Sequence, residues 1–339
     1  MKKKSMKIAI NGFGRIGRLI LRAFFESKRD YNFEIVAIND LLNIDTAVHL
    51  LKYDSVHGPF LHSVEKISET LFSVDGKRIT YTSEKFPQHL PWSEFGIDLV
   101  LECSGVFKSR TACQEHLNAG ARKVLISCPA SDVDCTLVYG VNDGTLDKIN
   151  DVIISNASCT TNCLAPLVKA IHENVGIASG FATTVHSYTG DQRLIDADHP
   201  DLRRTRAAAL NMIPTSTGAT KAIEKIFPEL KGKISGLSIR VPTSNVSVVD
   251  FTFQTLRKTT ANELNDAVVC YAENVLKGIL GYTNESLVSS DFNHNPLSAV
   301  VDMPLTTVIA GDMAHMVAWY DNEWGFSNRM LDASHLLLS

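Results

Sequence analysis

The sequence has no excess of basic residues, no long hydrophobic run and no repeated or low-complexity segment. Its formal net charge is −4, so it lacks the basic field that attracts nucleic acid or an anionic membrane. No run approaches the roughly 18 apolar residues of a membrane span. The basic start MKKKSMKIAINGFGRIG lacks the unbroken apolar core of a signal peptide, because Gly and Arg interrupt it. We therefore expect a cytoplasmic protein without nucleic-acid or membrane partners.

Cysteine is also scarce. Seven cysteines are an odd number in a chain of this length, which argues against a disulfide framework and for a reducing compartment. No Cys/His spacing resembles a zinc site, so no metal is predicted. The usual role of a free cysteine is that of a small buried hydrophobic residue, and this is our expectation for all of them except Cys159.

The pattern of the sequence changes near its middle. Up to about residue 150, short apolar runs at 7–11, 33–39, 97–103 and 124–127 alternate with amphipathic segments, which predicts a Rossmann-type parallel sheet. Residues 246–253 alternate apolar and polar side chains, which indicates an antiparallel sheet with one covered face. We predict an α/β domain at residues 1–158, an α+β domain at 159–322, and a helix at about 323–339 that packs back on the first domain.

A glycine motif follows the first expected strand. Gly12-Phe13-Gly14-Arg15-Ile16-Gly17 precedes an amphipathic helix pattern, and in that context the glycines permit a tight turn and close approach to a pyrophosphate at the helix N-terminus. Asp40 ends the next strand, where a carboxylate accepts from ribose hydroxyls and repels a 2′-phosphate. The two features together predict NAD as the cofactor. The alternatives are that the glycines only form a turn between strand and helix, and that Asp40 is only a turn residue. The strand end LVLECSG at 99–105 is expected at the same sheet edge.

The stretch ISNASCTTNC at 154–163 places Cys159 where a strand ends and a helix begins, with Ser158 or Asn156 available as the cap. Free N–H groups and the positive end of the helix dipole favour a thiolate there and can receive an oxyanion. Cys163 is expected to face the interior one turn later. His186, at the end of a β-branched strand, is the candidate base.

Segments downstream of His186 supply hydroxyls, backbone N–H groups and guanidinium groups for an anion. They are HSYTGDQ (186–192), Arg203-Arg204, TSTG (215–218) and IRVPT (239–243). Arg240 is the strongest of these candidates, because a charge flanked by Ile239 and Val241 requires a partner. An internal or inter-subunit ion pair is the alternative to a bound phosphate.

Together these segments resemble one family, the phosphorylating glyceraldehyde-3-phosphate dehydrogenases of bacterial type. INGFGRIGR, AIND, LLKYDSVHG, ISNASCTTN, HSYTGDQ, DLRRTRAAA, IPTSTGATKA, RVPTSNVSVVD and WYDNEWG occur in the family's order over nearly the whole chain. The resemblance implies a homotetrameric, NAD-dependent oxidoreductase of glycolysis or gluconeogenesis. It would convert glyceraldehyde 3-phosphate and inorganic phosphate to 1,3-bisphosphoglycerate through a hemithioacetal and a thioester on Cys159, with His186 as the base.

The resemblance also assigns binding residues. The implied cofactor contacts are Gly12, Gly14, Arg15, Ile16, Gly17, Asp40, Lys85, Ser127 and Asn322, of which Lys85 lies in a loop that departs from the family pattern. The implied substrate and phosphate contacts are Ser158, Thr160, Thr189, Arg204, Thr217, Gly218 and Arg240. Phe326 replaces a tyrosine of many members, and Asp198 replaces a proline common in members that prefer NAD.

Two other functions are weighed against this one. The sister enzyme erythrose-4-phosphate dehydrogenase shares the fold, and residues 291–296 and DNEWGF resemble it too. The threonine of HSYT and the TSTG loop, both present, favour the glyceraldehyde-3-phosphate reading. A nucleotide-binding protein without catalysis, or an enzyme with a second binding role, is the alternative of another class. The presence of both Cys159 and His186 argues against loss of catalysis.

Overall fold

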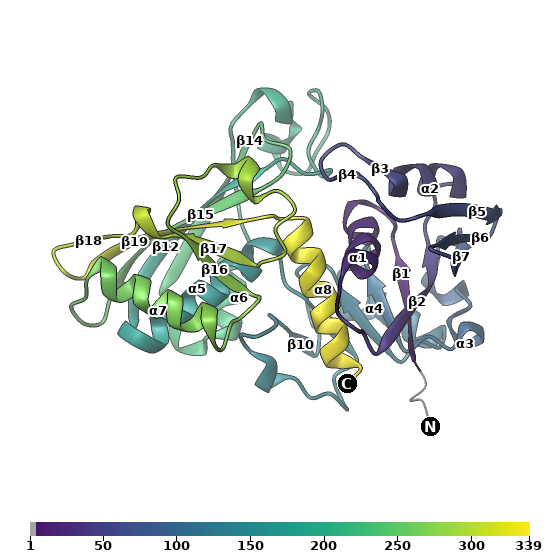
Figure 1. Ribbon diagram of the computed structural model, residues 1–339, viewed down its shortest axis with the longest axis horizontal. Coiled ribbons are helices and arrows are strands. Elements are labelled where there is room, and N and C mark those ends of the chain that lie inside the picture. The colour runs from purple at the N-terminus through teal and green to yellow at the C-terminus, as the bar shows by residue number, and fades with distance from the viewer. Residues whose placement is uncertain (1–4) are drawn as a thin grey trace. The chain divides into compact units, whose positions relative to one another are not determined.

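The structure, a computed structural model, describes residues 5–339. The basic residues 1–4, considered above with the question of a signal peptide, lie outside this range. The chain forms two compact units (Figure 1). The first comprises the chain up to Tyr139, Asp143–Ala157 and Ser327–Ser339, and the second comprises Gly140–Asn142 and Ser158–Phe326. In the described part of the chain, no helix has the length and apolar character needed to cross a membrane.

The first unit is built on a nine-stranded sheet in the order β10-β11-β9-β8-β1-β2-β7-β6-β5. Strands from β10 to β7 are parallel, and β6 and β5 extend the sheet antiparallel. The central residues of β1 (8–10) and β8 (99–101) are apolar and fully buried, as expected where helices cover both faces of a parallel sheet. The strands are β1 (Met6–Asn11), β2 (Phe33–Asn39), β5 (Val64–Ser68), β6 (Leu71–Val74), β7 (Lys77–Thr82), β8 (Leu99–Glu102), β9 (Lys123–Ile126), β10 (Cys135–Thr136) and β11 (Ile153–Ser155).

Helices connect these strands as the alternating pattern predicts. They are α1 (Arg15–Glu26), α2 (Ile44–Lys52), α3 (Trp92–Phe95) and α4 (Arg110–Asn118), with short 3-10 turns η1 (Pro87–His89) and η2 (Asp143–Thr145) and a small ladder of β3 (Tyr53–Asp54) with β4 (Gly58–Pro59). The last helix, α8 (Trp324–Leu337), follows β19 and belongs to the first unit from Ser327 onward. Asn43 and Ser109 cap α2 and α4 through their side chains. The residue before α1, Gly14, has no side chain and makes no side-chain cap.

The second unit contains an eight-stranded sheet in the order β13-β14-β12-β15-β19-β17-β16, with β18 beside β19. Only the pairs β12/β14 and β16/β17 are parallel. The predicted combination of a parallel sheet followed by a largely antiparallel one is therefore confirmed. The strands are β12 (Ile177–Ser187), β13 (Ile213–Thr215), β14 (Ile234–Val241), β15 (Ser247–Thr255), β16 (Leu280–Thr283), β17 (Ala299–Asp302), β18 (Thr307–Ile309) and β19 (Met313–Tyr320).

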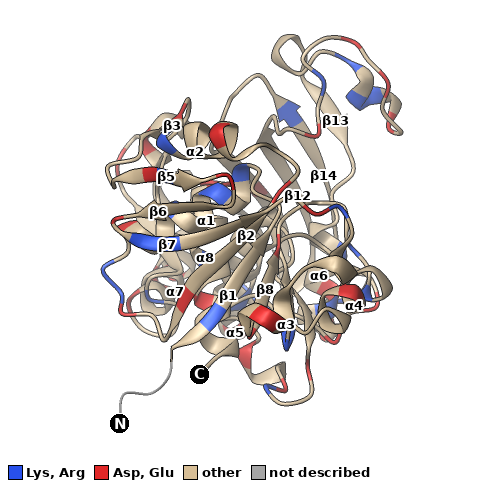
Figure 2. Ribbon diagram, turned by 90° about the vertical axis from the view of Figure 1, so that its right-hand side faces the viewer, with Lys and Arg blue, Asp and Glu red and all other residues tan. Residues whose placement is uncertain are grey.

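Three helices run along one side of the second sheet (Figure 1), where α5 packs between α6 and α7. They are α5 (Cys159–Val175), α6 (Ala219–Ile226) and α7 (Ala261–Glu273), accompanied by 3-10 turns η3 (Leu202–Thr205), η4 (Ala208–Leu210), η5 (Pro228–Leu230), η6 (Ser289–Phe292) and η7 (Met303–Leu305). Thr260 caps α7 by accepting from the Glu263 N–H, as its spacing predicts. Acidic and basic residues are interspersed along both units (Figure 2), so neither presents a continuous basic ribbon in that view.

Candidate active site

Cys159 is the first residue of α5, and Ser158 is its N-cap. Ser158 Oγ accepts from the Thr161 N–H at 3.0 Å, which satisfies one of the free donors at the helix start. Cys159 is partly exposed, whereas Cys163 is fully buried, with its Sγ 3.8 Å from the Ala318 carbonyl oxygen. Only the first of the two thiols is therefore open to a ligand.

His186 lies near the end of β12 and faces this thiol. Its Nε2 is 3.5 Å from Cys159 Sγ, and its Nδ1 is 2.7 Å from the Ser187 carbonyl oxygen. The Arg240 Nη1 donor is 3.1 Å from the same Nδ1, but the Ser187 carbonyl oxygen is closer and only accepts, so Nδ1 carries the proton and Nε2 presents its lone pair to the thiol. The geometry makes His186 an acceptor for the Cys159 proton.

The electrostatics of the pair favour its neutral form. Burial, together with the nearby Arg240 charge, lowers the pKa of His186 to about 3. Burial also raises the pKa of Cys159, against the lowering effects of Arg240 and of the Thr160 N–H. The N–H groups of Cys159 and Thr160 at the helix start lower the pKa of the thiol, as expected, but burial has the larger effect and raises it overall. Proton transfer has to accompany attack on the substrate.

A buried tyrosine that the sequence reading missed completes the wall of this site. Tyr320 Oη lies 2.9 Å from both Thr160 Oγ1 and Thr184 Oγ1, and its ring meets that of His186 edge-on at 6.0 Å. The hydroxyl of Thr160, a predicted substrate contact, is therefore engaged with a protein side chain. No local signal distinguishes Tyr320 from an ordinary residue at a strand end, because its contacts come from α5 and β12.

Arg240 lies beside His186, since β14 pairs with β12 in a register that aligns the two residues. Its Nη1 is 3.1 Å from the Ser187 carbonyl oxygen and 3.3 Å from Thr189 Oγ1. Its Nε is buried without a hydrogen-bond partner, and within residues 5–339 it forms no ion pair with a carboxylate. The internal ion pair considered as an alternative is thus not present here, and the free donor suits a bound anion.

The other predicted anion contacts are held by the protein itself. Arg204 donates to Asp191 at 2.6 Å and to Thr215 Oγ1 at 3.1 Å, yet its charge still acts on both His186 and Arg240. Thr217 Oγ1 accepts from the Ala219 N–H, and Gly218 precedes α6 without a side-chain cap. The contacts of the structure therefore link Cys159, His186, Arg240 and Thr189 directly, while Arg204, Thr217 and Gly218 lie on adjoining loops.

The first unit holds a cavity of about 520 Å³ at the carboxyl ends of its parallel strands. Four predicted cofactor residues line it: Gly12, Gly14, Asp40 and Lys85. Sequence reasoning did not single out the other lining residues, although they follow strand ends, which is where such folds bind ligands. These are Asn11, Asn39, Leu41, Glu84, Phe86, Cys103, Ser104, Val106 and Phe107, the last four within or just after the flagged LVLECSG strand end.

The glycine turn has the geometry that a dinucleotide requires. Gly12 has φ +92°, and a Cβ there would lie 2.3 Å from the Ser104 nitrogen; a Cβ on Gly17 would lie 2.1 Å from the Gly12 oxygen. Only glycine fits such close backbone approaches. Asp40 Oδ2 accepts from the Phe13 N–H at 2.5 Å, which fixes the carboxylate at the mouth of the turn. Because Gly14 makes no side-chain cap at the start of α1, the site fits a pyrophosphate.

The remaining predicted cofactor residues occupy other positions. Arg15 forms an ion pair with Asp54 at 2.7 Å, Ile16 lies partly buried in α1, and the Ser127 N–H donates to the Glu102 carbonyl oxygen at the end of β9. Asn322 belongs to the second unit, where its Oδ1 accepts from Ser187 and Ser247 at 2.9 and 2.8 Å. These two hydroxyls fix the orientation of the Asn322 amide.

Comparison with known families and proteins identifies the family of the chain. Residues 6–110 match the family model for the glyceraldehyde 3-phosphate dehydrogenase NAD binding domain, and residues 158–322 match that for the C-terminal domain. The chain belongs to the glyceraldehyde-3-phosphate dehydrogenase family. The family prediction is therefore confirmed, and with it an NAD-dependent oxidoreductase whose first sheet is of the Rossmann type.

Individual relatives of the family are similar over nearly the whole chain. The plasmid-encoded glyceraldehyde-3-phosphate dehydrogenase of Cupriavidus necator is 54% identical over 331 residues, covering 97% of this chain and 98% of the relative. That of Cereibacter sphaeroides is 52% identical over 330 residues with the same coverage. The chloroplastic enzyme GAPA1 of Arabidopsis thaliana is 52% identical over 332 residues, covering 98% of this chain and 83% of the relative.

Proposed function

We propose that this protein oxidises glyceraldehyde 3-phosphate to 1,3-bisphosphoglycerate with NAD and inorganic phosphate, a reaction of glycolysis and gluconeogenesis. The observation that carries the proposal is the group of Cys159, His186 and Arg240. A thiol lies 3.5 Å from the basic nitrogen of a neutral imidazole, beside a guanidinium that retains a buried free donor. These are the parts needed to make a thioester and to bind phosphate. Relatives of that name share about half of the sequence.

The geometry supports the following sequence of steps. His186 Nε2 takes the thiol proton as Cys159 Sγ bonds to the aldehyde carbon, and returning that proton to the carbonyl oxygen gives a hemithioacetal. N–H groups at the start of α5 stabilise the developing oxyanion. His186 then takes the hemithioacetal hydroxyl proton as a hydride leaves the carbon. NAD, held by the residues assigned below, would supply the hydride acceptor. The product on Cys159 is a thioester.

Phosphate completes the reaction. A phosphate oxygen attacks the thioester carbon, the C–S bond breaks, and Cys159 leaves as a thiolate while the acyl phosphate departs. We assign the two phosphate groups of this chemistry to Arg240, Thr189, Arg204, Thr217 and Gly218, with Ser158 and Thr160 at the start of α5. Arg240 supports the assignment best, because it touches Thr189 and lies beside His186.

We assign the cofactor to the cavity of the first unit. Gly12, Gly14 and Gly17 with the start of α1 would hold the pyrophosphate, with Arg15 and Ile16 in the first turn of α1, and Asp40 would accept from the adenosine ribose. Lys85, Ser127 and Asn322 are assigned as further contacts. Asn322 is held by Ser187 and Ser247 through its amide oxygen, which leaves its amide nitrogen to donate to the cofactor. The first unit, at about residues 1–158 with the C-terminal helix, would thus bind NAD, and residues 159–322 would carry the catalysis.

We further propose a cytoplasmic homotetramer. The loop between β12 and β13 exposes five large apolar side chains, Leu194, Ile195, Leu202, Leu210 and Met212, each at least 73% accessible. A group of that kind on a single chain supports burial against another subunit. Sedimentation equilibrium of the purified protein tests this directly: a tetramer mass is expected, and a monomer at micromolar concentration would contradict it.

The activity is tested by assaying two aldehydes with NAD, each with and without inorganic phosphate. We expect glyceraldehyde 3-phosphate to be preferred and turnover to depend on phosphate, since the thioester otherwise accumulates. Preference for erythrose 4-phosphate, or indifference to phosphate, would overturn the proposal. Repeating the assay with NADP tests the assignment of Asp40, whose carboxylate repels a 2′-phosphate.

A further inference from the structure

Buried polar side chains form a continuous hydrogen-bonded row along the carboxyl-terminal edge of the first sheet. The row crosses four adjacent strands, β8, β1, β2 and β7, and none of its first five members is more than 4% exposed. We call it the edge relay. Its members are Trp92, His116, Glu102, Asn11, Asn39 and Thr82.

One end of the edge relay has a defined proton arrangement. Trp92 Nε1 donates to His116 Nδ1 at 3.0 Å, and His116 Nε2 lies 3.0 Å from Glu102 Oε2. An indole N–H can only donate, so His116 Nδ1 carries no proton and Nε2 donates to the carboxylate. Trp92 therefore fixes the tautomer that lets His116 hold Glu102.

The other end is fixed by backbone groups. Asn39 Oδ1 accepts from the Glu84 N–H at 2.8 Å, while Asn39 Nδ2 donates to the Glu84 carbonyl oxygen at 2.9 Å and to Asn11 Oδ1 at 2.8 Å. Asn11 Nδ2 then donates to Glu102 Oε2 at 2.6 Å. Both amides thus have one allowed orientation, and donors from both ends converge on the Glu102 carboxylate.

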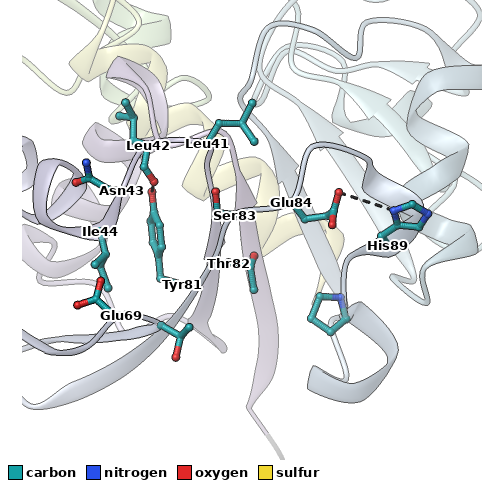
Figure 3. Close-up of a pocket in the computed structure, with 12 residues that line it drawn as sticks. Leu41, Leu42, Asn43, Ile44, Glu69, Tyr81, Thr82, Ser83, Glu84 and His89 are labelled. Carbon is teal, nitrogen blue, oxygen red and sulfur yellow. Dashed lines mark hydrogen bonds and ion pairs between the residues drawn. The ribbon is translucent and has the colours of Figure 1, made fainter.

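The edge relay connects two loops that line the cofactor cavity. Glu102 Oε1 accepts from the Ser104 N–H at 2.8 Å and from the Ser104 hydroxyl, and Ser104 is the residue against which Gly12 packs. At the far end Asn39 holds Glu84, which also lines the cavity. Figure 3 shows Glu84 and Thr82 on the side of a second cavity of about 580 Å³. Glu102, His116 and Trp92 line neither cavity.

We propose that Glu102, His116 and Trp92 are positioning residues for the cofactor, which set the separation of the Ser104 and Glu84 loops before NAD binds. The inference rests on the proposed position of the cofactor. Four donors meet the Glu102 carboxylate: Asn11 Nδ2, His116 Nε2, and the N–H and hydroxyl of Ser104. A glutamine there would turn its NH₂ group toward donors in either orientation, so at least one link breaks and a loop moves.

The experiment measures NAD binding by calorimetry on the full-length E102Q and H116F variants. We expect the NAD dissociation constant to rise about tenfold in each variant, because each loses one or two buried charge-assisted hydrogen bonds. H116Q can accept from Trp92 and donate to Glu102, so it should recover part of the affinity. Turnover at saturating NAD and the rate of Cys159 alkylation by iodoacetamide without NAD should stay within about twofold of native, because both report the second unit.

Ile97→Val is the matched control, since Ile97 is buried in the same apolar cluster as Trp92 but lies outside the edge relay. It should lower thermal stability without changing NAD affinity. Equal NAD affinity in E102Q, H116F and native protein would overturn the inference. So would a loss of NAD affinity that I97V shows equally, or one accompanied by slower alkylation of Cys159.

Asp40→Asn distinguishes the proposed cofactor position from the proposed positioning role. If D40N leaves the preference for NAD over NADP unchanged, the cofactor position fails; if D40N alters it while E102Q and H116F bind normally, only the positioning role fails.

Discussion

The polar cluster at Glu102 and the one at Arg240 differ in how completely their polar atoms are hydrogen-bonded. In the edge relay, which lies wholly among the described residues, every side-chain nitrogen and oxygen has a partner. On β14, the Arg240 guanidinium Nε and the Ser238 hydroxyl are buried without one. A buried polar atom without a partner is costly. The saturated cluster therefore maintains shape, and the unsaturated cluster is prepared for a ligand.

The largest expected effect comes from the thiol of the unsaturated cluster. Cys159→Ser should lower turnover about 10⁴-fold or more, as removal of a covalent nucleophile does, and should leave NAD binding intact. Steady-state kinetics and calorimetry measure the two quantities. Cys163→Ser is the control one turn along α5: because Cys163 is buried against Ala318, it should lower stability and spare turnover. A folded C163S protein that is equally inactive would reverse the roles of the two thiols.

Arg240→Gln should give the next largest effect. Loss of a guanidinium with a free buried donor should raise the KM for aldehyde or phosphate about 10²-fold. Because Arg240 lowers the pKa of Cys159, the variant should also alkylate with iodoacetamide only at higher pH than native protein. Arg206→Gln is the control, an arginine 61% exposed and paired with Asp196. An R240Q variant with native KM values and an unshifted alkylation profile would show that Arg240 only fills space.

Asp54 lies in the first unit, outside the edge relay, and predicts a pH effect on stability. Its carboxylate accepts from Arg15 and from the N–H groups of Val56 and His57, and these hydrogen bonds outweigh burial and hold its pKa at about 2. A lowered pKa contributes stability above the unfolded value near 3.8, and this is lost as pH falls toward 2. Asp54→Asn should cost about 1 to 2 kcal/mol at pH 7 and almost nothing at pH 2. Urea titrations at both pH values measure this loss in the free energy of unfolding. An equal loss at each pH would show that the stabilisation does not depend on ionisation of Asp54.

The smallest expected effect is a change in the KM for NAD on substitution of one of two buried serines, Ser187 and Ser238. Ser187 donates to Asn322 Oδ1, while the Ser238 hydroxyl has no partner. Ser187→Ala should raise the KM for NAD about threefold, because Ser247 still holds Asn322, and Ser238→Ala should leave it unchanged. Identical losses from both variants would mean that Ser238 binds something in the working enzyme.

Local sequence patterns were sufficient for the sheet types, the glycine turn and the Cys159 and His186 candidates. Each of these depends on neighbours in sequence: a strand end, a cap, a run of alternating residues. The edge relay could not be predicted, since Asn11, Asn39 and Glu102 become adjacent only when β1 inserts between β2 and β8. The burial that raises the pKa of Cys159 could not be predicted for the same reason, because it comes from the packed fold, whereas the lowering effect of the helix start depends on neighbours in sequence.

The wall between the two cavities of the first unit matters for protein engineering. Leu41 and Glu84 line both cavities, and Leu41 is 65% exposed, so its side chain can be shortened without opening the core (Figure 3). Gly12, by contrast, admits no side chain against Ser104. Variants with smaller residues at Leu41 and an unchanged glycine turn would have a larger space beside the cofactor and would keep the residues assigned to the pyrophosphate. Synthetic dinucleotides with bulky adenosine substituents are the natural molecules for such a screen.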